Sequence, residues 1–184
     1  FCHLDFGFGL AFELWNFIFN RLCYNNPMID FSQMLIRLVV AMVLGAIIGL
    51  ERERVGKEVG VRTAMTVSAG AALFSITGLM LPYIVATSAE NLSEVVARNG
   101  GFLNVIANIV VGIGFLGAGI IIKNEDRVHG LTSAAVVWLT AAVGVLAGIG
   151  LLKFATAATL IMVITLYVLR KLNIADKVRA QESS

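Results

Sequence analysis

Apolar residues fill five long stretches of the chain, and short charged segments separate them. Residues 63–89 and 99–122 contain no Asp, Glu, Lys or Arg, and residues 128–152 contain only one histidine among their ionisable side chains. A helix needs about 20 mostly apolar residues to cross a bilayer. The pattern therefore predicts an all-α integral membrane protein with about five spanning helices, at residues 31–50, 63–82, 102–122, 131–150 and 154–169, and Pro82 is expected to stop or kink the second.

The composition agrees with a membrane protein. Of 184 residues, 58% are hydrophobic and 14% are charged, which leaves little polar surface for a soluble domain. The net charge of +2 and the lack of a basic stripe argue against a nucleic-acid partner. Cys2 and Cys23 both precede the first clear span, where either a disulfide or two free thiols fit the sequence.

The basic residues indicate an orientation. Ten of the fourteen fall on one side of the predicted bundle: Arg52, Arg54, Lys57, Arg62, Lys123, Arg127, Arg170, Lys171, Lys177 and Arg179. Because cytoplasmic loops carry an excess of Lys and Arg, the amino terminus is expected outside and the carboxyl terminus inside. Residues 31–172 would then form the transmembrane domain and residues 173–184 a short cytoplasmic tail.

The first thirty residues are rich in aromatic side chains but are interrupted by Asp5, Glu13 and Arg21. Aromatic residues favour the headgroup level of a bilayer, so an interfacial helix on the outer face is the first interpretation of residues 1–30. A sixth spanning helix is the alternative, and it would place the amino terminus inside.

Small residues recur along three of the spans, as they do where membrane helices pack closely. The predicted packing positions are Gly45, Gly49, Gly112, Gly114, Gly117, Gly119, Gly144 and Gly148. The glycines of residues 112–119 point in several directions, so neighbouring helices are expected to surround that span. Asn104 and Asn108 share a helix face with Gly112 and Gly119, and their carboxamides need hydrogen-bond partners inside a bundle. Hydrogen bonding between helices is the preferred role for the two asparagines, and an ion or water path is the alternative.

A charged segment, residues 51–54, is expected to form a cytoplasmic loop after the first span. Glu51 and Arg62 flank this hairpin and are expected to meet at the membrane interface, where pairing lowers the cost of charge. Thr132 or Ser133 is expected to cap the fourth span, and His129 beside them is interpreted as a solvated loop residue. The candidate functional cluster comprises Glu51, Arg52, Arg62, Thr63, Thr132, Asn104 and Asn108.

Patterns that carry catalysis are missing from the sequence. It contains no phosphate loop, no nucleotide fingerprint, and no zinc-protease or serine-hydrolase motif. The two histidines, His3 and His129, and the two cysteines, Cys2 and Cys23, do not form a metal-binding spacing. The chain is therefore not expected to be an enzyme, to bind a cofactor or to hold a metal site.

Several of these segments together resemble the MgtC/SapB family of bacterial inner-membrane proteins, over about residues 34–150. The segments that carry the resemblance are Arg37, residues 45–53 (GAIIGLERE), 60–63 (GVRT), 70–74 (GAALF), 112–119 (GIGFLGAG), 127–135 (RVHGLTSAA) and 138–144 (WLTAAVG). Val61, Asn108 and Asn104 depart from the Leu, Gln and Arg usual in the family. The soluble cytoplasmic domain that many members append is not expected in a chain ending at Ser184.

The resemblance implies a non-catalytic inner-membrane protein that modulates other membrane machinery during magnesium limitation, acid stress or growth inside host cells. By the same resemblance, the proton-translocating ATP synthase is a possible partner besides the lipid bilayer. A small transporter of Mg²⁺ or protons is the alternative. Because Mg²⁺ is usually bound through carboxylates and no Asp or Glu lies in the middle of a predicted span, the transporter is less favoured. A homo-oligomer is expected in either case.

Overall fold

The computed structural model describes residues 29–85, 101–124 and 127–172. The predictions for residues 1–28, including both cysteines, and for the tail after Leu172 lie outside these described ranges.

Five helices account for most of the described chain: α2 (Phe31–Arg54), α3 (Val61–Val85), α5 (Gly101–Ile120), α6 (Leu131–Gly148) and α7 (Leu152–Lys171). All five are long and apolar enough to cross a membrane, which confirms the predicted fold class. Two three-residue strands, β1 (Ile122–Asn124) and β2 (Arg127–His129), form an antiparallel hairpin between α5 and α6 with Lys123 opposite Val128. The sequence analysis did not predict this hairpin.

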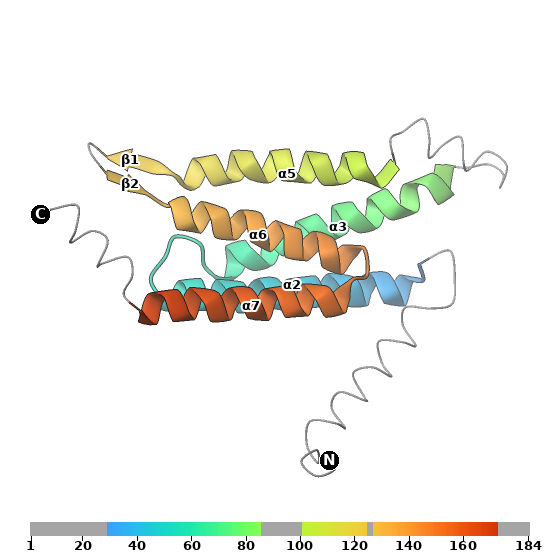
Figure 1. Ribbon diagram of the computed structural model, residues 1–184. Helices are drawn as coiled ribbons and strands as arrows, with labels where there is room; N and C mark the ends of the chain where they lie inside the picture. Colours follow the sequence, from blue (N-terminus) through green and yellow to red (C-terminus); the bar gives the residue numbers. More distant parts are fainter. Residues whose placement is uncertain (1–28, 86–100, 125–126, 173–184) are drawn as a thin grey trace, which may run out of the picture.

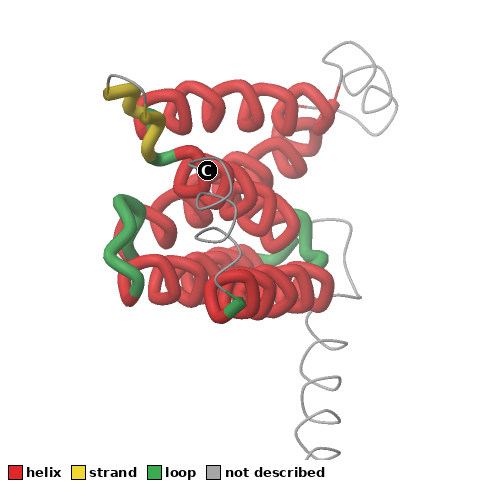
Figure 2. The backbone as a smooth tube through the Cα atoms, turned by 60° about the vertical axis from the view of Figure 1, so that its left-hand side comes forward, coloured by secondary structure: helices red, strands yellow, loops and turns green. Residues whose placement is uncertain are grey.

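The helices lie in three layers (Figure 1). Helices α3 and α6 form the middle layer, α2 and α7 lie on one side of it, and α5 lies on the other, an arrangement that Figure 2 shows from a second direction. The most apolar stretch of α6 is 61% buried inside the protein, whereas that of α5 is only 11% buried. Large apolar side chains such as Leu103, Phe115 and Ile161 face outward, as expected for helices in contact with lipid.

Two helix boundaries differ from the predictions. Residues 51–54, expected as a loop, form the last turn of α2. Glu and Arg are good helix formers, and Arg52 and Arg54 sit where a helix C-terminus favours positive charge. Pro82 is expected from the sequence to stop or kink the second span. The stop is wrong, because α3 continues through Pro82 to Val85, and the kink stays a prediction.

Four glycines bring the backbones of α2 and α6 against α3. At Gly45, Gly49, Gly144 and Gly148, an added Cβ would lie less than 3.0 Å from an atom of α3 or of the residue just before it, closer than side chains pack. Gly45 and Gly144 approach the same residue, Ser68, from opposite helices. Helix α3 is therefore held between two glycine faces at a separation that no larger residue allows.

The glycines of α5 have different surroundings. An added Cβ at Gly117 would make an ordinary contact of 3.7 Å with Ala134, whereas Gly112, Gly114 and Gly119 have nothing within 4 Å. Within the described part of this chain, those three positions do not pack against another helix. Helices that surround α5 would therefore have to come from outside the described residues, and that expectation stays a prediction.

The close approach of α6 to α3 predicts a sharp difference between two glycine-to-alanine substitutions. Gly144→Ala should lower the stability of the folded protein by about 1–3 kcal/mol, because an overpacked contact forces the backbones apart. Gly114→Ala, on the open side of α5, should leave stability unchanged or slightly raised, because alanine favours the helix. Unfolding midpoints in a mild detergent compare the two, and equal effects would contradict the role assigned to Gly144.

Candidate functional site

Charged and polar side chains gather at one end of the bundle, where α2 and α7 end and α3 and α6 begin, at the left of Figure 1. We call this the charged end. It contains a polar cavity of about 240 Å³, lined by Arg52, Lys57, Glu58, Val128, His129, Gly130, Leu131, Thr132 and Ser133.

Arg52 is the most deeply buried charged residue of this end, with 4% of its surface exposed. Its Nη1 atom lies 3.8 Å from Oε2 of Glu51. Its Nε and Nη2 atoms are buried and have no hydrogen-bond partner among the described residues. A buried cation with unmet donors is energetically costly. From the sequence alone, Arg52 is most simply interpreted as a solvated residue that marks the cytoplasmic side of the membrane. Its burial shows that the side chain is not freely solvated.

Glu51 pairs with a residue that the sequence analysis did not select. Its carboxylate lies 3.7 Å from Nη1 of Arg170 at the end of α7, and the Arg170 guanidinium stacks over the Tyr167 ring. The predicted Glu51–Arg62 pair is wrong for the described structure, in which Arg62 is exposed on α3. The reason is that α2 stays helical through Glu51, so its side chain is directed by the helix toward Arg52 and α7.

Thr63 next to Arg62 is also exposed. The two residues therefore lie on an accessible face at the start of α3 and do not line the polar cavity.

Glu58, in the loop between α2 and α3, is a second residue that the sequence analysis missed. Its carboxylate accepts a 2.5 Å hydrogen bond from the buried Ser133 hydroxyl of α6. This bond, with smaller contributions from the nearby Lys57 and Arg52 charges, lowers the pKa of Glu58 below its ordinary value. No motif marked Glu58, because its partner is 75 residues away along the chain.

The start of α6 is built differently from the prediction. Gly130 occupies the N-cap position with a φ of 83°, and no side chain caps the first turn from there. The expected cap by Thr132 or Ser133 is therefore wrong. A side chain at position 130 would also collide with the Ile120 carbonyl at the end of α5. Thr132 and His129 are both exposed and line the polar cavity.

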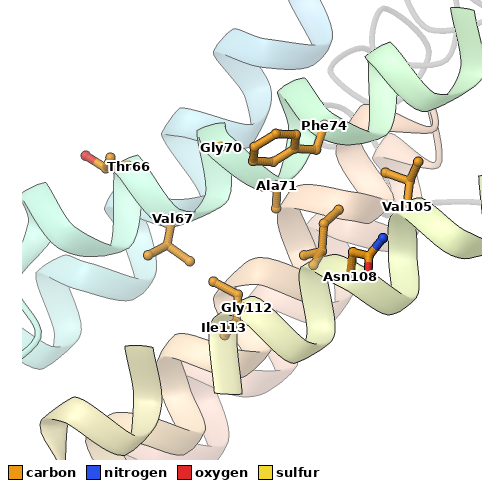
Figure 3. Close-up of a pocket in the computed structure, with 10 residues that line it drawn as sticks. Thr66, Val67, Gly70, Ala71, Phe74, Val105, Asn108, Gly112 and Ile113 are labelled. Atoms are coloured by element: carbon orange, nitrogen blue, oxygen red, sulfur yellow. The ribbon is translucent and has the colours of Figure 1, made fainter. Parts of the chain in front are cut away.

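A second hollow lies between α3 and α5 (Figure 3). This apolar groove has a volume of about 580 Å³ and is lined by Thr66, Val67, Gly70, Ala71, Phe74, Val105, Asn108, Ile109, Gly112 and Ile113. Gly70 on α3 and Gly112 on α5 both face open space. Asn108 is exposed in the groove, whereas Asn104, also exposed on α5, does not line it.

The predicted cluster is thus divided between two places. Glu51, Arg52 and Thr132 belong to the charged end, and Asn108 belongs to the groove. Within residues 29–85, 101–124 and 127–172, no three His, Cys, Asp or Glu side chains gather closely enough to hold a metal ion.

The bond between Ser133 and Glu58 predicts a pH-dependent stability difference between the protein and its Glu58→Gln variant. A lowered pKa means that the ionised carboxylate stabilises the folded state above pH 4.5 and that this contribution is lost as pH falls through the lowered value. The protein should therefore be more stable than the variant at neutral pH, and the difference should vanish in acid. Thermal unfolding in detergent across this range measures it, and a difference that persists unchanged in acid would contradict the assignment.

Comparison with known proteins places this architecture in a family. The MgtC family matches residues 38–174 of the chain. Protein MgtC of Salmonella typhimurium is 38% identical over 137 residues, protein SrpB of Synechococcus elongatus is 37% identical over 148, and an uncharacterized protein of Haemophilus influenzae is 38% identical over 145. These matches cover 74%, 76% and 77% of this chain.

The same matches cover 52% of the Salmonella protein, 76% of SrpB and 56% of the Haemophilus protein. The chain therefore spans about half the length of two of these relatives. No solved structure matches the chain significantly. The family match covers most of the chain and confirms the resemblance that the sequence motifs indicated, so this multi-pass membrane protein belongs to the MgtC family.

Proposed function

We propose that this protein is a non-catalytic regulator of the bacterial inner membrane, and that it binds a transmembrane helix of another membrane protein in the groove between α3 and α5. The observation that carries the proposal is the open groove of about 580 Å³ with an unfilled glycine on each wall. Small residues let helix backbones approach closely in a bilayer, and Gly70 and Gly112 offer that approach to a helix from outside the chain.

The polar side chain in the groove supports the same occupant. Asn108 projects from α5 at membrane depth within an otherwise largely apolar lining. A carboxamide in hydrocarbon is stabilised when it finds a hydrogen-bond partner, and lipid tails offer none. A partner helix with a polar side chain at this depth would provide both the packing and the hydrogen bond.

The family resemblance supplies the physiological setting of the proposal. In this setting the protein modulates membrane machinery during magnesium limitation, acid stress or intracellular growth, and the proton-translocating ATP synthase is the partner to test first. The excess of basic residues at the charged end supports a cytoplasmic location for that end. The amino terminus would then lie outside and the carboxyl terminus inside.

Transport of Mg²⁺ or protons is the competing function. Acidic side chains in the described helices lie near helix ends, as Glu51 and Glu53 do in the last turn of α2. Mg²⁺ is usually held by carboxylates and retained water, so the described helices lack the usual ligands at the membrane centre. Purified protein in liposomes with Mg²⁺ and proton reporters tests this alternative, and flux above that of empty liposomes would favour it.

The groove predicts opposite results for two leucine substitutions on α5. Gly112→Leu fills the groove, whereas Gly114→Leu points into open space outside it. In liposomes that contain purified ATP synthase, the protein should alter ATP-driven proton pumping, Gly112→Leu should lose most of that effect, and Gly114→Leu should keep it. Full activity of Gly112→Leu would reject the groove, and no effect of the unmodified protein would reject this partner.

A second copy of the chain is the other helix source that could fill the groove, since a homo-oligomer is expected from the sequence. The oligomeric state of each variant in detergent is therefore measured in parallel. One outcome would contradict the proposal: Gly112→Leu dissociates an oligomer and still alters ATP-driven proton pumping as the unmodified protein does. In that case the groove is a contact between copies and the proposed partner is wrong.

A further inference from the structure

Helix α5 carries a second surface, besides the groove, that is open in the described structure. Its positions are all exposed and follow one another at steps of three and four residues: Asn104, Ala107, Val111, Gly114 and Ala118. At 100° per residue they fall within an arc of about 80°. Steps of three and four are the spacing of helices that pair along a seam, and we call these positions the α5 seam.

The α5 seam faces away from the described bundle. Gly117 faces Ala134 of α6, and Ile113 packs against a cluster that includes Val137. On a helical projection, Gly117 and Ile113 lie roughly 100° and 140° from the centre of the seam. Gly112, on the wall of the groove, lies about 120° from it. The seam is therefore separate from both the intramolecular contact of α5 and the groove.

Exposure to lipid alone does not account for the small residues of the seam. The outward face of α7 carries large apolar side chains, as a surface covered by lipid tails allows: Leu160, Ile161, Ile164 and Val168. The seam instead carries Ala107, Gly114 and Ala118, and an added Cβ at Gly114 would have nothing within 4 Å. Small residues at this spacing let the backbone of a second helix approach closely.

The polar residue of the seam indicates which helix approaches. Copies of one chain insert in the same orientation, so their α5 helices run parallel, and a twofold axis places each seam residue opposite its own counterpart. Asn104 would then face a second Asn104. A carboxamide offers both donors and an acceptor, so two of them are self-complementary, and one Asn in a parallel seam fixes the register.

We propose that the α5 seam binds the same seam of a second copy of this chain, forming a twofold dimer with parallel α5 helices. Backbone contact at Gly114 and Ala118 supplies the packing, and paired Asn104 carboxamides set the register. Because Gly112 lies on a different face of α5, each copy keeps its groove toward α3 accessible. This inference does not rest on the function proposed above.

The strength of the dimer is tested with the whole purified chain in liposomes, by energy transfer between differently labelled copies at several protein-to-lipid ratios. Gly114→Leu should weaken the apparent dimerisation constant about tenfold or more, because leucine holds the backbones apart. Gly112→Leu makes the same change on the groove wall and should leave the constant nearly unchanged. Asn104→Leu should weaken it about threefold, since a hydrogen bond between membrane helices contributes modestly.

The position of the contact is tested by oxidative cross-linking in a background where Cys2 and Cys23 are replaced by serine. With copper phenanthroline as oxidant, Ala118→Cys should form a disulfide between copies. Leu116→Cys is the matched control, because Leu116 is also exposed but lies on the other side of α5, about 160° from the centre of the seam. Ala118→Cys is a small change, so it remains informative if Gly114→Leu fails to fold.

Cross-linking at Ala118→Cys alone, together with a weaker dimer in Gly114→Leu, supports the seam. The proposal is overturned if energy transfer shows a monomer at every ratio, if Leu116→Cys cross-links as readily as Ala118→Cys, or if Gly112→Leu weakens the dimer as much as Gly114→Leu does. A monomer would leave the groove proposal standing, because that proposal requires only one copy.

Discussion

The close approach of α2 and α6 to the backbone of α3 is the constraint on which the rest of the structure depends. Lipid offers helices no hydrophobic reason to associate, so packing at short distance must hold the bundle together. Ser68 lies at the centre of this packing, with Gly45 on one side and Gly144 on the other. These contacts fix the three helices against one another, and α7 then packs against α2 and α6 through residues such as Leu152 and Ala155.

A bundle organised around α3 leaves α5 at its margin. The hairpin of β1 and β2 and the contact between Gly117 and Ala134 hold one end of α5 near α6, but three of its glycines meet no other helix of the described chain. Glycine in a helix interior lowers the stability of the helix compared with alanine. The three open glycines make no compensating contact within the described chain, so they lower the stability of α5. Contact with another helix is the physical circumstance in which such residues become favourable.

Sequence reasoning predicted the membrane spans well because a charge-free apolar run of some 20 residues matches the thickness of a bilayer. It failed at the ends of the spans, where charge and helix propensity compete. Residues 51–54 look like a loop because they are charged, yet they continue α2. That continuation decides which side chains Glu51 can reach, so the error in the end of α2 led to the wrong partner for Glu51.

The packing role of each glycine could not be predicted from the sequence. Gly144 and Gly114 sit in similar apolar surroundings along the chain, but only Gly144 touches α3. Spacing identifies glycine faces without saying which helix lies opposite, because that depends on the order of helices in space.

The two hollows of the molecule differ in the chemistry of the residues that line them. The groove between α3 and α5 is largely apolar. A helix that packed closely in it would be stabilised by van der Waals contacts, which in a bilayer depend on complementary shape more than on charge. The cavity at the charged end is lined mainly by polar and charged residues, among them Lys57, Glu58 and Ser133. One hollow lies along the membrane-spanning helices and the other at their end, and no residue lines both. Helix α6 contributes Ser133 and Thr132 to the polar cavity and, further along, the glycine face that positions α3. One helix therefore joins the charged end to the close packing at the centre of the bundle.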